Sequence, residues 1–357
     1  MTTVLAIVFV LGVLIFFHEL GHFLVAKALG IGVKTFSLGF GPKIFGFRVN
    51  RTDLQISAFP LGGYVKLFGE EQDDFDPRFS DAEDFSKRPP LHRILVVAAG
   101  PIFNLLLAWI LYFLVFLNVG QQMLTNEIGG VVDGSPAQAV GLKKGDKIIE
   151  INGKPITYWD DIVDIVSHEK RFPLRFKIKR GDRTLLVKIT PRVEKTKNIF
   201  GEEIKVNRVG IIAANKWVHI NLSAKDATLL SFKQTWVVTK LTFEGIVKLV
   251  ERVVPIENIG GPIMIAQLVS SQAKAGFFDL LALTALISIN LGLLNFLPIP
   301  VLDGGHLLFY SLEIITRRPL SPKVKEVAMK IGLGIIIGLM MLAVYNDINR
   351  LMGQNIK

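Results

Sequence analysis

The sequence of 357 residues contains no cysteine. Disulfide bonds, thiolate metal ligands and a thiol nucleophile are therefore excluded. The chain also lacks a recognisable nucleic-acid-binding motif, although its formal net charge is +10. Its lysines and arginines are scattered and do not alternate with aromatic residues as in a nucleic-acid groove. Attraction to anionic lipid headgroups accounts for such a charge, so we expect a lipid bilayer and no nucleic acid as partner.

Apolar residues make up 50% of the sequence, and the mean hydropathy is +0.44. Four stretches approach the length of about 20 apolar residues that a helix needs to cross a bilayer. They cover residues 4–29, 93–119, 277–298 and 327–345. We therefore predict a polytopic α-helical membrane protein with four transmembrane helices. No small-residue cleavage site follows the first stretch, so we expect it to remain in the mature protein.

Basic residues in short loops indicate which side of the membrane is cytoplasmic. The loop between the third and fourth stretches carries Arg317, Arg318, Lys323 and Lys325. This loop is expected to be cytoplasmic, and parity places the loop between the first two stretches on the same side. Both termini and the long segment of residues 120–275 are then expected to be extracytoplasmic.

The outer segment is predicted to contain a small β-rich module, because residues 128–192 alternate β-like runs with turn signals. The stretch 141–153 resembles the PDZ domain fingerprint, which implies binding of an extended peptide by strand addition. A spacer that restricts access to the membrane part is the alternative. Residues 225–253 have a helical period typical of a helix at the membrane surface, or of a core helix in the outer domain. We thus divide the chain into residues 1–119, 120–220 (the PDZ domain), 221–275 (the surface helix) and 276–357.

The first apolar stretch ends in the motif His18-Glu19-Leu20-Gly21-His22. On a helix, two histidines four residues apart share one face and can bind one metal ion, and Glu19 beside them can act as general base. Ionisable groups inside a membrane cost roughly 2.5–3.5 kcal/mol each on insertion scales and by default mark function. A polar helix end at the membrane interface is the alternative interpretation.

Catalytic zinc usually takes three protein ligands, so a third donor must come from elsewhere in the chain. The best candidate is Asp303, which follows the third apolar stretch. Pro298 and Pro300 just before it are expected to break the helix, which is tolerated at membrane depth where the backbone is buried or lines a wet cavity. Parity places Asp303 in the same leaflet as the two histidines.

These motifs together resemble the site-2 protease family of intramembrane zinc metalloproteases. The resemblance covers the His-Glu motif, Gly39-Phe40-Gly41-Pro42, the single PDZ insert and the run from Asn295 to Gly304. It implies that His18, His22 and Asp303 bind Zn²⁺, that Glu19 activates water and that Asn295 helps to hold the substrate backbone. Some members carry two PDZ domains in tandem, whereas only one fingerprint is visible in this sequence.

The resemblance also implies a membrane-associated β-hairpin within residues 54–67. We expect Gly63, Tyr64 and Val65 to bind an unwound substrate by strand addition, because a helical substrate hides its peptide groups in its own hydrogen bonds. An ordinary surface hairpin is the alternative. Outside these motifs, Asn104 is expected to hydrogen-bond across helices, and a contact with the substrate is the alternative. His306 is either a support for Asp303 or a polar helix-end residue.

The sequence therefore predicts a zinc metalloprotease of the bacterial cytoplasmic membrane, with its active site towards the cytoplasm. The family resemblance suggests single-pass membrane proteins as substrates, either an anti-sigma factor already trimmed on its outer side or remnant signal peptides. A membrane zinc transporter is one rival, but it would not need Glu19 beside the ligands. A scaffold that uses a PDZ domain to organise envelope proteins is the other, and it would leave the His-Glu motif unexplained.

Overall fold

The structure is a computed structural model that describes residues 3–70 and 76–354. The described chain divides into two compact units. Residues 116–227 form unit 2, and the chain on either side of them forms unit 1. The sequence placed the limits of the outer domain at residues 120 and 220, a few residues inside those of unit 2.

Among the described residues of unit 1, four helices are long and apolar enough to cross a membrane. They are α1 (Thr3–Ala28), α2 (Pro90–Val119), α7 (Phe277–Asn295) and α9 (Pro322–Gln354). Each overlaps one predicted stretch. α2 begins at a proline, which is tolerated because the N–H of a first helical residue has no partner within the helix. α7 ends shortly before Pro298, which cannot continue a helix. α9 extends beyond the predicted 327–345 at both ends, because polar residues that flank an apolar run can still be helical.

The described part of unit 1 also contains α5 (Ala224–Val250), α6 (Pro262–Ala275) and α8 (Asp303–Thr316), with short 3-10 turns at Asp81–Glu83 and Ile256–Asn258. From residue 228 onward α5 belongs to unit 1, so it is not a core helix of the outer domain. Its side chains Leu229, Phe232 and Trp236 are more than 60% exposed. Large exposed apolar residues of this kind suit a helix that lies in the membrane interface.

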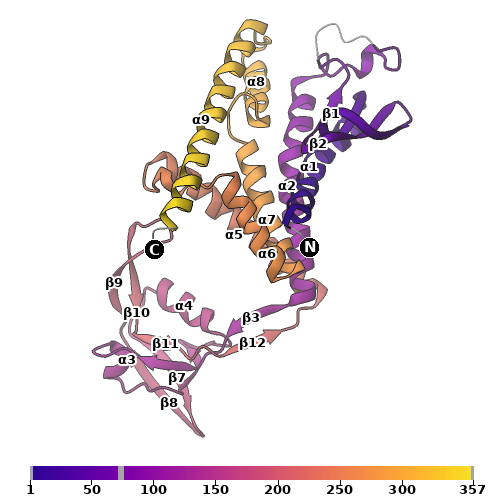
Figure 1. Ribbon diagram of the computed structural model, residues 1–357. Coiled ribbons are helices and arrows are strands. Elements are labelled where there is room, and N and C mark those ends of the chain that lie inside the picture. The colour runs from indigo at the N-terminus through magenta and orange to yellow at the C-terminus, as the bar shows by residue number, and fades with distance from the viewer. Residues whose placement is uncertain (1–2, 71–75, 355–357) are drawn as a thin grey trace. The chain divides into compact units, whose positions relative to one another are not determined.

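The strands β1 (Val33–Val49) and β2 (Thr52–Leu67) lie beside α1 and α2 (Figure 1). The turn between them is at Asn50-Arg51, so the hairpin is larger than the one predicted within residues 54–67. Residues 35–38 of β1 pair with two segments of β2, 53–56 and 63–66. A strand has only two edges, so these segments must flank it on opposite sides. No other described strand pairs with residues 63–67, which leaves that segment at an edge.

A cluster of buried apolar residues ties this edge to the helices. It joins the end of α1 and both strands to α2 and α8, and it consists of Ala26, Ile31, Val33, Leu67, Phe85, Val96 and Tyr310. Burial of a large apolar side chain stabilises a fold by about 1.5–3 kcal/mol. The cluster therefore fixes residues 63–67 relative to α1, which carries the His-Glu motif.

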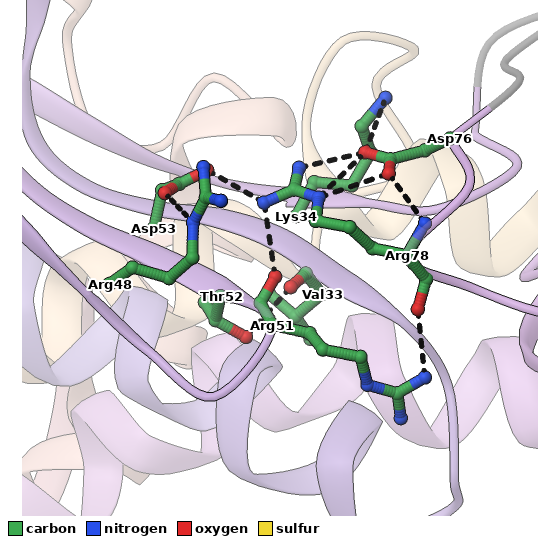
Figure 2. A network of polar contacts seen from close by, with 8 residues as sticks. All are labelled: Val33, Lys34, Arg48, Arg51, Thr52, Asp53, Asp76 and Arg78. Carbon is green, nitrogen blue, oxygen red and sulfur yellow. Dashed lines mark hydrogen bonds and ion pairs between the residues drawn. The ribbon is translucent and has the colours of Figure 1, made fainter.

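A network of charged side chains fastens the loop before α2 to the sheet (Figure 2). The guanidinium of Arg78 donates to Asp76 at 2.7 Å and to Asp53 at 2.9 Å, and it also donates to the carbonyl of Arg51 at 3.2 Å. Lys34 on β1 lies 3.8 Å from Asp76. Hydrogen bonds from Arg78 lower the pKa of Asp76 to about 2, and Lys34 adds a smaller effect.

Unit 2 is built from short strands and two helices around its own core. Its helices are α3 (Pro136–Ala139) and α4 (Trp159–His168). Its strands are β3 (Gln121–Leu124), β4 (Ile128–Val131), β5 (Lys147–Ile151), β6 (Lys154–Pro155), β7 (Leu174–Arg180), β8 (Arg183–Ile189), β9 (Arg192–Lys197), β10 (Glu203–Arg208), β11 (Ile211–Ala213) and β12 (Trp217–Ile220). The largest sheet has the order β6-β5-β7-β8, and the pairs β4–β11, β9–β10 and β3–β12 accompany it. Fully buried side chains such as Ile148, Phe176 and Ile178 form the core.

Replacing Arg78 with Gln is expected to lower the free energy of unfolding by about 1–2 kcal/mol near pH 7, because hydrogen bonds to charged groups are lost from a partly solvated site. The pKa of Asp76 is depressed from 3.8 to about 2 in the folded protein. Its contribution is therefore fully present above about pH 4 and is lost as the pH falls towards 2.

Thermal unfolding in detergent, followed by circular dichroism, would measure this difference as a function of pH. Lys330→Gln is the matched control, since its ion pair with Glu326 is exposed and contributes little. A gap between wild type and Arg78→Gln that stayed constant down to pH 2 would contradict the assignment.

Candidate metal centre

Two imidazoles and one carboxylate converge in unit 1. His18 and His22 share one face of α1, and their Nε2 atoms are 3.3 Å apart. Asp303, the first residue of α8, places its carboxylate oxygens 3.2 Å from Nε2 of His18 and 3.7 Å from Nε2 of His22. The ligand atoms all lie within 4.8 Å of one another. The three predicted metal ligands are thus brought together from segments almost 300 residues apart.

The donor atoms of this cluster fit a zinc ion. Nδ1 of His22 lies 2.9 Å from the backbone carbonyl of Val96 on α2. A carbonyl can only accept, so Nδ1 carries the proton and Nε2 presents a lone pair. Asp303 Oδ2 is buried and has no hydrogen-bond partner among the described residues. Lone pairs and a carboxylate oxygen that converge in this way need a cation, and two imidazoles with one carboxylate are a common zinc set.

Glycines allow α1 and α2 to approach closely at this point. A Cβ atom at Gly21 would lie 2.7 Å from the backbone carbon of Ala99 on α2. A Cβ atom at Gly100 would lie 2.6 Å from Cε1 of His22. Both distances are shorter than real Cβ contacts, so glycine is required on each helix. This is the packing by small residues that membrane helices use.

Asp303 is presented by a tight reversal of the chain between α7 and α8. Val301 has a φ of +99°, a strained conformation for a β-branched residue. A Cβ atom at Gly305 would lie 2.6 Å from the carbonyl oxygen of Ile299. α8 is held against α2 by an ion pair of 2.6 Å between Arg93 and Glu313, whose side chains are 9% and 14% exposed. The loop and the ion pair together fix the first residue of α8.

Glu19 lies beside the cluster and contacts the edge segment of β2. Its carboxylate accepts a hydrogen bond from the backbone N–H of Val65. A Cβ atom at Gly63 would lie 3.1 Å from Cγ of Glu19, so glycine there lets the strand lie against α1. The carboxylate is therefore held beside the two imidazoles.

A cavity of about 560 Å³ opens next to these groups. The four predicted metal and catalytic residues line it, and so do His306 and the three predicted strand residues Gly63, Tyr64 and Val65. Asn295 does not line it. It is the half-buried last residue of α7, and its contact with a substrate backbone stays a prediction.

Two groups on α2 contact the histidines, and the sequence predicted only one of these contacts. Asn104 on α2 lies 3.1 Å from Nδ1 of His18, which confirms the expected hydrogen bond across helices. The carbonyl of Val96 was missed, because every residue has a backbone carbonyl and only the packing of α1 on α2 selects this one. The pair Gly100-Pro101 inside an apolar helix was the available signal that another helix approaches closely.

The chain is similar to known proteins over most of its length. A family model described as Peptidase family M50 matches residues 6–339. A Campylobacter jejuni protein named as a zinc metalloprotease is 40% identical over 352 residues, which cover 98% of this chain and 94% of the relative. Metalloprotease MmpA of Caulobacter vibrioides is 31% identical over 377 residues, or 97% of this chain and 95% of the relative. A crystal structure of the HtrA3 PDZ domain matches 20% of this chain and 80% of its own length, with 25% identity and a TM-score of 0.18.

Gly332 on α9 is expected to be required for the position of Asp303. A Cβ atom at Gly332 would lie 2.7 Å from the backbone carbon of Pro300, in the loop that presents Asp303, whereas one at Gly334 would meet nothing within 4 Å. Gly332→Ala should therefore displace the loop and weaken zinc binding by about tenfold, at the low end of the effect of disturbing ligand supports.

Competition with a chelating dye would measure this affinity in detergent. Gly334→Ala is the matched control and should bind zinc normally, with slightly higher thermal stability from its better helix propensity. Equal zinc affinity of the two variants would show that α9 does not support the loop.

Proposed function

Because the chain belongs to peptidase family M50, the site-2 protease family, it is a zinc metalloprotease of the membrane, and we propose that its substrates are single-pass membrane proteins. The cut would fall within or near the membrane-spanning segment of the substrate, as in regulated intramembrane proteolysis. The observation that carries this proposal is the position of His18, Glu19 and His22 on a helix that is apolar enough to cross a bilayer. An anti-sigma factor and remnant signal peptides are the proposed substrate types.

The roles of the catalytic residues follow from their geometry. His18, His22 and Asp303 would hold zinc. When bound, zinc supplies the Lewis acidity that polarises a carbonyl group and makes water more acidic. The carboxylate of Glu19 takes the proton of the attacking water and then delivers it to the nitrogen of the leaving amine. Val65 keeps that carboxylate in place through its backbone N–H.

The edge segment of β2 is the proposed binding site for the unwound substrate. The backbone N–H of Val65 donates to Glu19, and that of Leu67 donates to the carboxylate of Glu70 at 3.2 Å. Residues 65 and 67 are two apart, so both N–H groups point to the same side of the strand, away from β1. An extended substrate would take over these two N–H groups from the carboxylates, pair along this side and bring its scissile carbonyl next to Glu19.

A peptide segment is the proposed ligand of unit 2. β11 pairs with β4 along one edge, and a cavity of about 770 Å³ lies between β11 and α4. Ile211 and Ile212 of β11 and Val163 of α4 line this cavity. A free strand edge beside an apolar helix face suits the capture of an extended chain end, such as one left by an earlier cut in the outer part of a substrate.

The proposed location is the bacterial cytoplasmic membrane, with both termini and unit 2 on the outer side. Lys325, in the first turn of α9 and next to the basic loop between α8 and α9, lines the catalytic cavity. The cavity therefore lies at the end of the helices that the positive-inside rule assigns to the cytoplasm. Water for hydrolysis would enter from that side. Neither a zinc transporter nor a scaffold would require Glu19 beside the ligands.

Purified enzyme in detergent is expected to cut a model single-span substrate, and to cut it faster when its outer segment has been trimmed to a free carboxylate. Glu19→Gln should bind zinc as tightly as wild type but lose at least about 100-fold in rate, since a general base typically contributes 10²–10⁴-fold. Removal of zinc with a chelator should abolish cleavage, and added zinc should restore it.

Mass spectrometry of the products would locate the cut relative to the span. Full activity of Glu19→Gln would refute the catalytic assignment. Cleavage by wild type that did not depend on trimming would refute the proposed role of unit 2 and leave the protease assignment intact.

Strand pairing of the substrate should give disulfide cross-links with a period of two. The natural chain has no cysteine, so a cysteine at Tyr64 would be its only thiol. This change is combined with Glu19→Gln to prevent cleavage, and single cysteines are placed at successive substrate positions. Alternate positions should cross-link, because side chains of a strand alternate between its two faces.

Cross-link yields with a period near 3.6 would mean that the substrate binds as a helix, and would contradict strand addition. A cysteine at Ile44, an exposed residue of β1 outside the cavity lining, is the control and should not cross-link to the substrate span.

A further inference from the structure

Asn104 is fully buried and contacts a proposed metal ligand. Its Nδ2 lies 3.1 Å from Nδ1 of His18, while its Oδ1 is buried and has no hydrogen-bond partner among the described residues. The backbone carbonyl of Asn104 accepts a hydrogen bond of 2.7 Å from Ser288 on α7. The backbone of Asn104 is therefore fixed, while either end of its side-chain amide can face the imidazole.

The two histidines differ in the kind of partner that each one has. His22 faces the carbonyl of Val96, which only accepts, so a single tautomer of its ring is compatible with that contact. His18 faces an amide, whose oxygen accepts and whose nitrogen donates. The two ends of an amide have nearly the same shape, so a rotation of 180° exchanges them without disturbing the packing.

Each tautomer of His18 has a matching orientation of the amide. When Nε2 carries the proton, its N–H lies 3.3 Å from Nε2 of His22 and 3.2 Å from Asp303 Oδ2, and Nδ1 accepts from the amide nitrogen of Asn104. When Nδ1 carries the proton, it donates to the amide oxygen, and Nε2 offers its lone pair to a cation. Only the second arrangement allows His18 to bind zinc through Nε2.

We propose that Asn104 is a positioning residue that turns its amide when zinc binds, and thereby switches His18 from the first tautomer to the second. The proposal rests on the proposed function, in which His18 is a zinc ligand. The carbonyl of Val96 holds His22 in the tautomer that binds the metal, whereas His18 changes its tautomer when the metal binds. The first arrangement also brings a ring N–H within 3.2 Å of the Asp303 carboxylate, so its partial positive charge faces that oxygen when no cation is bound.

Zinc affinity of two variants, measured by chelator competition, tests the proposal. Asn104→Leu keeps the size of the side chain but removes the acceptor, and it should weaken zinc binding by about 10–100-fold. Asn104→Asp supplies an oxygen that only accepts, and it should bind zinc at least as tightly as wild type. Ser288→Ala is the control, because it removes the α2–α7 hydrogen bond without touching the amide, and it should lower thermal stability but not zinc affinity. Equal weakening by Leu and Asp would overturn the proposal, since Asn104 would then only fill space.

A second measurement uses the wild-type protein and so does not depend on the folding of a variant. Long-range ¹H–¹⁵N spectra of histidine side chains, recorded at one pH before and after zinc is added to chelator-treated protein, report which ring nitrogen carries the proton. His18 should change from Nε2–H to Nδ1–H, and His22 should have Nδ1–H throughout. If His18 had Nδ1–H in both spectra while both rings responded to zinc, the switch would be wrong and the metal site would stand. If neither ring responded to zinc, the metal site itself would be wrong, and the switch with it.

Discussion

The close approach of α1 to α2 is the constraint on which the metal centre depends. Gly21 and Gly100 leave no room for a Cβ atom between the helices. Only at this separation does the carbonyl of Val96 reach one imidazole and the amide of Asn104 reach the other. Water is scarce inside a bilayer, so such partners must come from the neighbouring helix. The orientation of both histidines is therefore a property of the helix pair and not of α1 alone.

The third ligand depends on the interruption of a helix. α7 ends at Asn295, and a reversal through two prolines restarts the chain as α8 with Asp303 in its first position. The strained backbone of Val301 is compatible with a loop that is held on several sides. Arg93 contributes to this support from α2 through its buried ion pair with Glu313. α2 thus contacts and positions the elements that carry the ligands from both ends of the chain, α1 and α8.

Much of the site was predictable because its signals are local. Two histidines four residues apart on a helix must share a face, and four apolar runs are visible by length alone. The ends of the first and third predicted spans lie on the same side of the membrane, and this was enough to predict that Asp303 lies near the histidines. The pairing of β1 with two separate segments of β2 was not predictable, since the glycines at 62 and 63 also suit a tight turn and the register is set by tertiary packing. The partner of His22 could not be predicted either, because every residue has a backbone carbonyl and the sequence does not show which one the imidazole contacts.

The short pair of strands β3 and β12 joins the two ends of unit 2, with Gln121 opposite Ile220. The chain therefore enters and leaves this unit at a single place. A module attached through one two-stranded stem can be lengthened, duplicated or replaced during evolution without changing the distance between the helices that flank the stem. The helices of unit 1 can thus be inherited nearly unchanged, while unit 2 diversifies.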